Sequence, residues 1–308
     1  MVTLLNRRKT MVSRLIITRL VAAIILVTAF ALSACHKEVE KLATAEPTVI
    51  VDSVPSEDGL MIYYDVHGQG DRALVFVHCW SCDRTYWQNQ VDEFAKNYRV
   101  VTVDLGGHGQ SGPNRKVWTI AAFGADVAAV AKKLDLKSIV LIGHSMGGPV
   151  CIEAARRLPG RVVAIIGVDN FQSFGETLTK EQVDGWVAGF SPDFATATDP
   201  FVRSMFPAGT DSSLVNRIAS DMASAPPDVA ISAITETLLY DYRAALEEVR
   251  VPIRTISSDK HATDVKGNAA IAASFAIKLM PGRGHFLQLE DPGTFNRLLH
   301  ETLAEFWP

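Results

Sequence analysis

The chain has 308 residues, of which 48% are hydrophobic and 21% are charged, a composition typical of globular proteins and too apolar for a disordered one. Its formal net charge of -4 argues against a basic nucleic-acid-binding protein. Its four cysteines are too few for a disulfide scaffold, and a core of this size is stable without such cross-links. We therefore expect one large or two small globular domains and no nucleic-acid partner.

The first 34 residues differ in charge from the rest of the chain. They contain five basic and no acidic residues, which leaves 25 basic and 34 acidic residues, a formal charge of -9, in the remainder. The mostly apolar run from Leu20 to Ala34 is shorter than the ~20 apolar residues of a membrane-spanning helix. A basic start, a short apolar run and small residues at its end are typical of a secretory signal, with an uncleaved membrane anchor as the alternative.

The end of this segment, Leu32-Ser33-Ala34-Cys35, resembles a bacterial lipoprotein cleavage box. The resemblance implies that residues 1–34 are a signal peptide, that Cys35 becomes the lipid-modified first residue, and that residues 35–48 form a polar tether. His36 follows the cysteine where an aspartate would favour retention at the inner membrane. We therefore expect an exported protein on the periplasmic side, lipid-anchored to a bacterial membrane and preferentially to the outer one.

From residue 49 onward, predicted strands and helices alternate. Apolar and β-branched runs predict strands at 49–54, 60–66, 73–77, 99–103, 138–142, 162–168, 253–256 and 275–279. Helical patterns cover 85–96, 120–134, 146–158 and 291–306. This alternation predicts one α/β domain with a mostly parallel sheet.

Residues 171–250 interrupt the alternation. This segment has helical patterns that five prolines break, and it lies between two predicted strands of the sheet. We therefore predict a helical cap at 171–250, inserted into a core made of residues 49–170 and 251–308.

The strongest chemical motif is Gly143-His144-Ser145-Met146-Gly147, which follows a predicted buried strand and opens a predicted helix. This context matches a nucleophile elbow, a turn so tight that side chains at both glycine positions would clash. The turn pushes the serine hydroxyl out of the sheet, and the helix start places backbone N–H groups near a developing oxyanion. We predict that Ser145 is a nucleophile.

Three further segments accompany the elbow in chain order: Val75-Phe76-Val77-His78, Asp104 to Gly112, and Gly284-His285-Phe286 followed by Glu290-Asp291-Pro292. Together with the elbow they resemble the α/β-hydrolase superfamily, in its capped, esterase- or lipase-like form, over roughly residues 49–308. The resemblance implies the α/β-hydrolase fold, with a mostly parallel central sheet flanked by helices and an inserted helical cap.

A serine hydroxyl needs a general base, and histidine suits this task because its usual pKa lies near 6.5. We predict His285 as this base, since its glycine-rich loop follows the last predicted strand. The acid that orients the imidazole has three candidates. We place Asp169 first, directly after the strand 162–168, Asp259 second and Asp264 third.

An oxyanion hole needs two backbone N–H donors, for which we predict Met146 and Trp80, with Cys79 as a neighbouring alternative to Trp80. Members of the superfamily usually have glycine where this chain has Cys79, which puts the loop geometry in doubt because cysteine tolerates positive φ less well. Cys79 and Cys82 also form a C-x-x-C. We favour two free thiols, and a local disulfide or a redox pair remains open.

These residues predict a serine hydrolase that cleaves a carboxylic ester, or a similar acyl bond, through an acyl-enzyme on Ser145. The same triad could serve a carbon–carbon bond or amide hydrolase, and a non-catalytic ligand-binding protein on the same scaffold is a further alternative. The sequence has no dedicated cofactor site and no convincing metal-ligand spacing. The expected partners are a small ester-like substrate and, through the N-terminal lipid, a membrane, and the oligomeric state is unknown.

Overall fold

The protein is described from a computed structural model that covers residues 49–307. The predicted signal peptide (1–34), the lipid-modified Cys35 and the tether (35–48) lie outside the described residues. Within the described range, no helix combines the length and the apolar character needed to cross a membrane.

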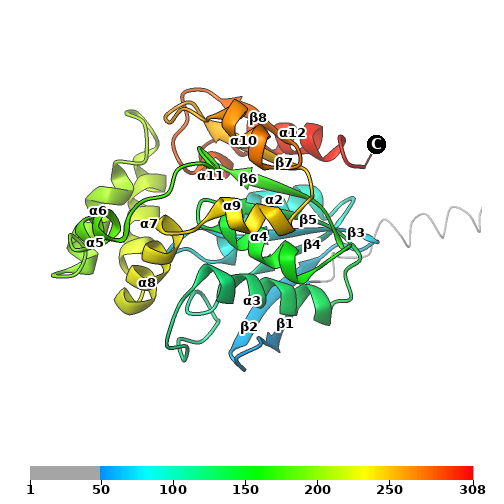
Figure 1. The fold of residues 1–308 in the computed structure, drawn as a ribbon, viewed down its shortest axis with the longest axis horizontal. Helices are drawn as coiled ribbons and strands as arrows, with labels where there is room; N and C mark the ends of the chain where they lie inside the picture. The colour runs from blue at the N-terminus through cyan, green and yellow to red at the C-terminus, as the bar shows by residue number, and fades with distance from the viewer. Residues whose placement is uncertain (1–48, 308) are drawn as a thin grey trace, which may run out of the picture. The chain divides into compact units, whose positions relative to one another are not determined.

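An eight-stranded sheet forms the centre of this part of the chain (Figure 1). Its spatial order is β1-β2-β4-β3-β5-β6-β7-β8. The first two pairings, β1 with β2 and β2 with β4, are antiparallel, and the others are parallel. In chain order, β1 to β8 span Ile50–Pro55, Met61–His67, Arg72–Val77, Arg99–Val103, Ser138–His144, Val162–Val168, Ile253–Ser258 and Phe275–Met280. The sequence-based prediction of a mostly parallel α/β sheet is confirmed.

Helices cover both faces of the sheet, as expected for strands that are apolar on both sides. On β3, Val75 and Val77 belong to one buried cluster, whereas Leu74 and Phe76, which alternate with them, belong to the other. The first face packs against α3 (Ile120–Lys133), α4 (Gly147–Arg157) and α9 (Tyr242–Glu248), and the second against α2 (Gln88–Phe94) and α12 (Pro292–Leu303). The remaining short elements are η1 (Arg84–Trp87), α10 (Val265–Ile271) and α11 (Leu287–Glu290).

The segment that we predict to be an inserted cap is helical. Between β6 and β7 the chain forms α5 (Lys180–Val187), α6 (Phe194–Arg203), α7 (Ser212–Ala223) and α8 (Pro227–Leu238) before α9. Figure 1 shows α5 to α8 gathered at one side of the sheet, whereas α9 lies along α4. The last helix of the predicted cap segment is therefore tied to the core, through the ion pair between Arg156 and Glu248 at 2.5 Å.

The close packing of α3 on α4 depends on Gly124. A Cβ atom at this position would lie 2.3 Å from the Cβ of Glu153 on α4, well inside van der Waals contact. Because α4 begins at the predicted nucleophile, this helix pair fixes the base of the turn that carries Ser145.

We expect Gly124→Ala to destabilise the fold by about 1–3 kcal/mol, the usual cost of overpacking, although alanine favours a helix over glycine by ~1 kcal/mol. The control is Gly185→Ala on α5, where an added Cβ meets no atom within 4 Å and stability should stay the same or rise. Chemical denaturation of both variants measures the difference, and equal stability of Gly124→Ala and the parent would refute this packing constraint.

Candidate active site

Ser145 lies on a sharp turn between β5 and α4. Its backbone is left-handed, with φ of 53°, and its N–H donates to the Val168 carbonyl oxygen of the neighbouring strand at 3.0 Å. A Cβ at Gly143 would lie 2.2 Å from the Gly147 carbonyl oxygen, and one at Gly147 would lie 2.5 Å from the Val77 carbonyl oxygen. Only glycine fits at both positions, so the structure has the geometry that the sequence motif predicts.

Asp169 and His285 come together at the ends of β6 and β8. The Asp169 Oδ2 and the His285 Nδ1 are 2.6 Å apart, and the Ser258 N–H donates to the Asp169 Oδ1 at 2.8 Å. Burial opposes ionisation of the carboxyl group, whose side chain is 4% exposed. The hydrogen bond and charge of His285, together with the bonds from Ser258, outweigh burial, so the pKa of Asp169 lies below its usual value.

The two other candidate acids are engaged elsewhere. Asp259 accepts a hydrogen bond from the Gly282 N–H at 2.9 Å, so its carboxylate holds the turn after β8. Asp264 caps the start of α10 by accepting from the Gly267 N–H at 2.9 Å. The structure therefore brings Asp169, and neither rival, to the imidazole.

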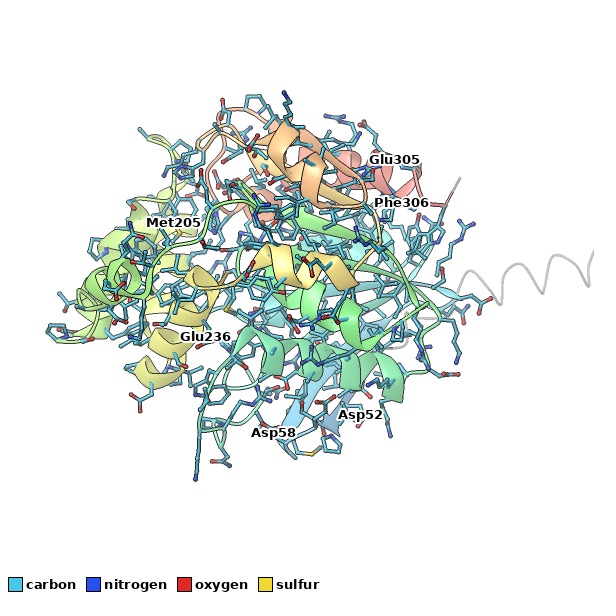
Figure 2. The ribbon with its side chains drawn as sticks, in the orientation of Figure 1. Asp52, Asp58, Met205, Glu236, Glu305 and Phe306 are labelled. Carbon is cyan, nitrogen blue, oxygen red and sulfur yellow. A yellow bond between two sulfur atoms is a disulfide. The ribbon has the colours of Figure 1, made fainter. Side chains whose placement is uncertain are left out.

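The backbone around His285 is held by partners on both sides. Glu290 accepts from the Gly284 N–H at 2.8 Å and from the Phe286 N–H at 3.0 Å. The His285 N–H itself donates to the carbonyl oxygen of Met205 at 3.2 Å, and Figure 2 shows Met205 on the cap side of the molecule. Sequence reasoning missed Glu290 as a positioning residue, although it stands five positions after His285.

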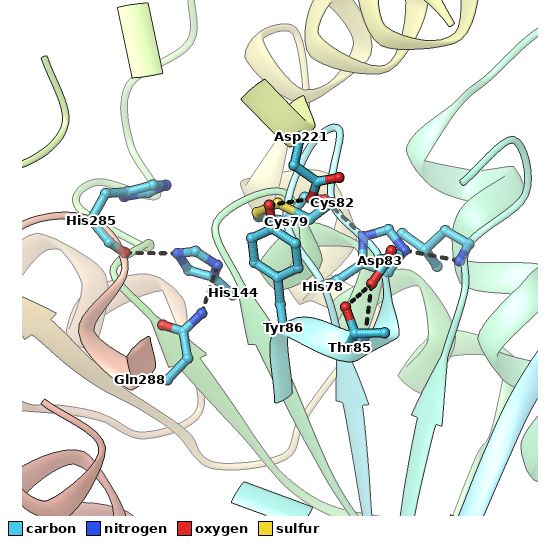
Figure 3. Close-up of a disulfide and its surroundings, with 11 residues drawn as sticks. His78, Cys79, Cys82, Asp83, Thr85, Tyr86, His144, Asp221, His285 and Gln288 are labelled. Carbon is cyan, nitrogen blue, oxygen red and sulfur yellow. Dashed lines mark hydrogen bonds between the residues drawn. A yellow bond between two sulfur atoms is a disulfide. The ribbon is translucent and has the colours of Figure 1, made fainter. Parts of the chain in front are cut away.

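The side chain of His144 contacts the same loop at the His285 carbonyl oxygen (Figure 3). Its Nε2 lies 2.8 Å from the His285 carbonyl oxygen, and its Nδ1 lies 3.2 Å from the Gln288 Nε2. A carbonyl oxygen can only accept, so Nε2 carries the proton and Nδ1 accepts from the glutamine. Burial is the main cause that lowers the pKa of His144 to about 3, and the ring therefore stays neutral.

Asn170 links the turn of Ser145 to the end of β6, which carries Asp169. Its side-chain amide donates to the carbonyl oxygens of Gly143 at 2.8 Å and Ser145 at 3.0 Å. It stands between two left-handed residues, Asp169 with φ of 47° and Phe171 with φ of 62°. Sequence reasoning missed Asn170, and its place directly after Asp169 was the available indication.

Both predicted oxyanion donors lie in one cavity with the serine. Trp80 and Met146 line this cavity of about 840 Å³, as do Ser145 and His285. Within residues 49–307, neither the Trp80 nor the Met146 N–H has a hydrogen-bond partner. The Ser145 hydroxyl and the imidazole are not hydrogen-bonded to each other, a separation that catalytic pairs often close only when substrate binds.

The rest of the cavity wall is mainly apolar. The described residues that line it, besides the four above, are Cys79, Asp169, Asn170, Phe171, Gln172, Phe201, Ser204, Met205, Met222, Ile234, Thr237, Leu238, Tyr242, Lys260, His261 and Ala262. Most come from the cap helices or from the loops after β6 and β7. No group of three or more His, Cys, Asp or Glu side chains in the described part of the chain is arranged to hold a metal ion.

Cys79 and Cys82 form a disulfide (Figure 3), which corrects our preference for two free thiols. The expected conflict at Cys79 does not arise, because Cys79 is not among the residues with positive φ. Ser81 has the left-handed backbone instead, with φ of 55°. The left-handed residue of this loop is therefore Ser81, and the loop is closed by a covalent bond.

Comparisons with known proteins agree with this fold. A family model described as alpha/beta hydrolase family matches residues 74–298, and the chain belongs to this family. It is similar to the dihydrolipoyllysine-residue acetyltransferase component of the acetoin cleaving system of Cupriavidus necator, with 28% identity over 80% of this chain and 67% of that one. It is also similar to 3-oxoadipate enol-lactonase 2 of Acinetobacter baylyi, with 23% identity over 83% of this chain and 97% of the relative.

Solved structures show the same fold. The esterase of Exiguobacterium antarcticum superimposes with a TM-score of 0.73 at 20% identity, covering 83% of this chain and all of the other. The bromoperoxidase of Bacillus anthracis gives a TM-score of 0.72 at 22% identity with the same coverage.

The clamp on the His285 loop can be tested with Glu290→Gln. Glutamine offers one acceptor oxygen, so one of the two backbone N–H groups loses its partner, and we expect a loss of about 1–3 kcal/mol in stability. Thermal and chemical unfolding provide the measurement. Glu301→Gln on α12, where the side chain is 47% exposed, is the matched control and should change stability by less than about 0.5 kcal/mol. A Glu290→Gln variant as stable as this control would contradict the assignment.

Proposed function

We propose that this member of the family is a serine hydrolase that cleaves carboxylic esters, or similar acyl bonds, through an acyl-enzyme on Ser145. The observation that carries the proposal is the contact of His285 with the ionised Asp169 at 2.6 Å, beside the strained serine and in the same cavity. Ester and lactone chemistry in the names of similar proteins supports this reaction class.

The proposed reaction begins when substrate brings its carbonyl carbon to the Ser145 Oγ. His285 removes the hydroxyl proton at Nε2, while its Nδ1–H remains hydrogen-bonded to the Asp169 carboxylate, which stabilises the imidazolium that forms. The tetrahedral oxyanion accepts hydrogen bonds from the N–H groups of Met146 and Trp80. The imidazolium then protonates the leaving alcohol, and the C–O bond of the ester breaks.

Water completes the cycle by the same steps. His285 takes a proton from water, the resulting hydroxyl attacks the acyl carbon, and the proton returns to the Ser145 Oγ as the acid leaves. The cavity volume of about 840 Å³ and its mainly apolar wall favour medium-sized apolar acyl groups. We further propose that the enzyme works on the periplasmic side of a bacterial membrane, since the N-terminal 35 residues resemble a lipoprotein signal.

Hydrolysis of p-nitrophenyl esters from acetate to palmitate by the full chain tests the reaction. We expect activity with an optimum at intermediate chain length, and a loss of at least about 10³-fold in kcat in Ser145→Ala, because the nucleophile is removed. Equal residual rates in parent and variant, with no covalent labelling of Ser145 by a fluorophosphonate, would favour the non-catalytic binding protein. Labelling without ester hydrolysis would point to an amide or carbon–carbon bond substrate.

The choice of acid predicts a contrast between two aspartates. Asp169→Asn should lower kcat by roughly 10³-fold or more, because an amide cannot stabilise the imidazolium. Asp259→Asn keeps an oxygen for the Gly282 N–H and should leave kcat within about threefold of the parent, as a surface change does. Steady-state kinetics of both variants decide the point, and the reverse order of losses would assign the acid to Asp259.

A further inference from the structure

In the loop between β3 and η1, one disulfide joins the residues that flank Trp80 and Ser81. Cys79 and Cys82 are joined covalently and enclose Trp80 and Ser81, and all four residues are buried, with exposures of 1–5%. Cys79 and Trp80 line the cavity that contains Ser145. Neither the ester chemistry proposed above nor the packing of the core requires a cross-link at this place.

Two hydrogen bonds to the Cys79 carbonyl oxygen determine the direction of the Trp80 N–H. The Cys79 carbonyl oxygen accepts from the His78 Nδ1–H at 2.7 Å and from the Cys82 N–H at 3.3 Å. In a trans peptide the C=O of one residue and the N–H of the next point in opposite directions, and the described chain has no cis bond. Holding the Cys79 carbonyl therefore also fixes the Trp80 N–H, which lies in the same peptide plane and points the opposite way. Within residues 49–307 this N–H has no hydrogen-bond partner.

His78 can hold this carbonyl only as a donor at Nδ1. Its Nε2 accepts from the Leu105 N–H at 3.0 Å, so Nδ1 carries the proton. Burial lowers the pKa of His78 to about 4, and the neutral tautomer persists at the pH of the reaction. The second donor to the carbonyl, the Cys82 N–H, is in place because the disulfide brings Cys82 back to within 5.4 Å of Cys79, measured between Cα atoms.

The side chain of Trp80 is held by the cap, but its contacts do not prevent rotation of the peptide between Cys79 and Trp80. On the cap side, the Trp80 indole N–H donates to the Ala230 carbonyl oxygen of α8 at 2.7 Å. The indole ring packs edge-on against three phenylalanines, Phe190, Phe194 and Phe201, at centroid distances of 5.9–6.1 Å. These contacts fix the tryptophan side chain, but they leave the peptide before it free to turn about its two flanking bonds.

The backbone of Ser81 is strained. A left-handed backbone costs a non-glycine residue roughly 1–2 kcal/mol, and Ser81 is held there with a hydroxyl that has no hydrogen-bond partner. The hydroxyl does nothing to stabilise this conformation. The strained turn occurs together with the ring closed by Cys79 and Cys82 and the Cys82 N–H bond to the Cys79 carbonyl oxygen, so we expect opening of the ring to let Ser81 relax and to release the Cys82 N–H.

We propose that the Cys79–Cys82 disulfide is a positioning element for the oxyanion hole, and that its reduction changes the enzyme to a folded form with much lower kcat. The inference rests on the proposed function, since it assigns a task to the Trp80 N–H. A dithiol performs the switch: one thiolate attacks a disulfide sulfur, the second closes the reagent into a ring, and two electrons and two protons pass to the protein. Cys79 lines the cavity that contains Ser145.

Other parts of the loop do not depend on the bond. Tyr86 on η1 donates its hydroxyl to the Asp221 Oδ2 of α7 at 2.5 Å (Figure 3), and Asp83 caps η1 through the Thr85 N–H at 2.8 Å. These contacts continue to anchor the segment after reduction. The expected change is therefore confined to residues 79–82, and substrate affinity, which depends on the cavity wall, should change little.

The test compares kcat and KM for p-nitrophenyl butyrate among the oxidised parent, the parent reduced with excess dithiothreitol, and Cys79→Ser/Cys82→Ser. The control Cys151→Ala removes the buried free cysteine and keeps the disulfide. Thiol titration after unfolding should find two more thiols in the reduced parent than in the oxidised one. We expect kcat to fall about 10- to 100-fold on reduction and in the double variant, less than the ~10²–10³-fold loss for removing one oxyanion donor outright, with KM within about threefold.

A second readout separates positioning from a general structural effect. A trifluoromethyl ketone forms an anionic adduct with the serine and needs the oxyanion hole, whereas the corresponding alcohol does not. We expect reduction to weaken inhibition by the ketone by the same factor as kcat and to leave inhibition by the alcohol unchanged. Reoxidation should restore the parent but not the double variant, and Cys151→Ala should behave as the parent in every assay.

Several results would overturn the inference. An equal thiol count before and after reduction would show that the bond is absent in solution. A reduced parent that keeps kcat within twofold of the oxidised form would show that the bond is not needed, while leaving the proposed function intact. Loss of the folded state on reduction, detected by circular dichroism, would make the disulfide a staple of the fold. An oxidised parent without Ser145-dependent hydrolysis would refute the proposed function and this inference together.

Discussion

Two sharp turns lie side by side where β5 and β6 end, and the rest of the site depends on this pairing. His144 pairs with Val168 in the parallel register, so the next residue on each strand is Ser145 on one side and Asp169 on the other. Both are left-handed, a conformation that L-residues avoid unless the surroundings impose it. The amide of Asn170, which donates to the Gly143 and Ser145 carbonyl oxygens, connects the two turns and satisfies their backbone.

This pairing explains how the acid can follow β6. The end of β7 contributes a donor instead of a carboxylate, since the Ser258 N–H binds the Asp169 Oδ1. The backbone around His285 is held by Glu290, His144 and the Met205 carbonyl oxygen. Each binds within one residue of His285 and leaves the ring free to meet Asp169.

Local features of the site could be predicted from sequence, and features that depend on distance between segments could not. The elbow, the strands on either side and the loop of His285 are each contained in a few consecutive residues with a distinctive pattern. The choice among Asp169 after β6 and Asp259 and Asp264 after β7 depends on which of these carboxyl groups faces the imidazole, and nothing in the local sequence records that. Glu290 was missed for a related reason, since its two partners are backbone N–H groups four and six residues earlier, which no side-chain pattern records.

The disulfide was mispredicted because the C-x-x-C spacing allows both states. Its formation depends on the turn at Ser81, and a serine gives no local indication of a left-handed backbone. The concern about cysteine at position 79 assumed a positive φ there, but the left-handed residue of this loop is Ser81.

The cap is part of this site and does more than cover it. Its helix α8 accepts the Trp80 indole N–H through Ala230, and the chain just after α6 accepts the His285 N–H through Met205. One cap contact therefore lies at the proposed oxyanion donor and another at the proposed base. Exchanging the cap for another helical segment would alter these two backbone positions as well as the cavity wall, so specificity and turnover cannot vary independently in this protein.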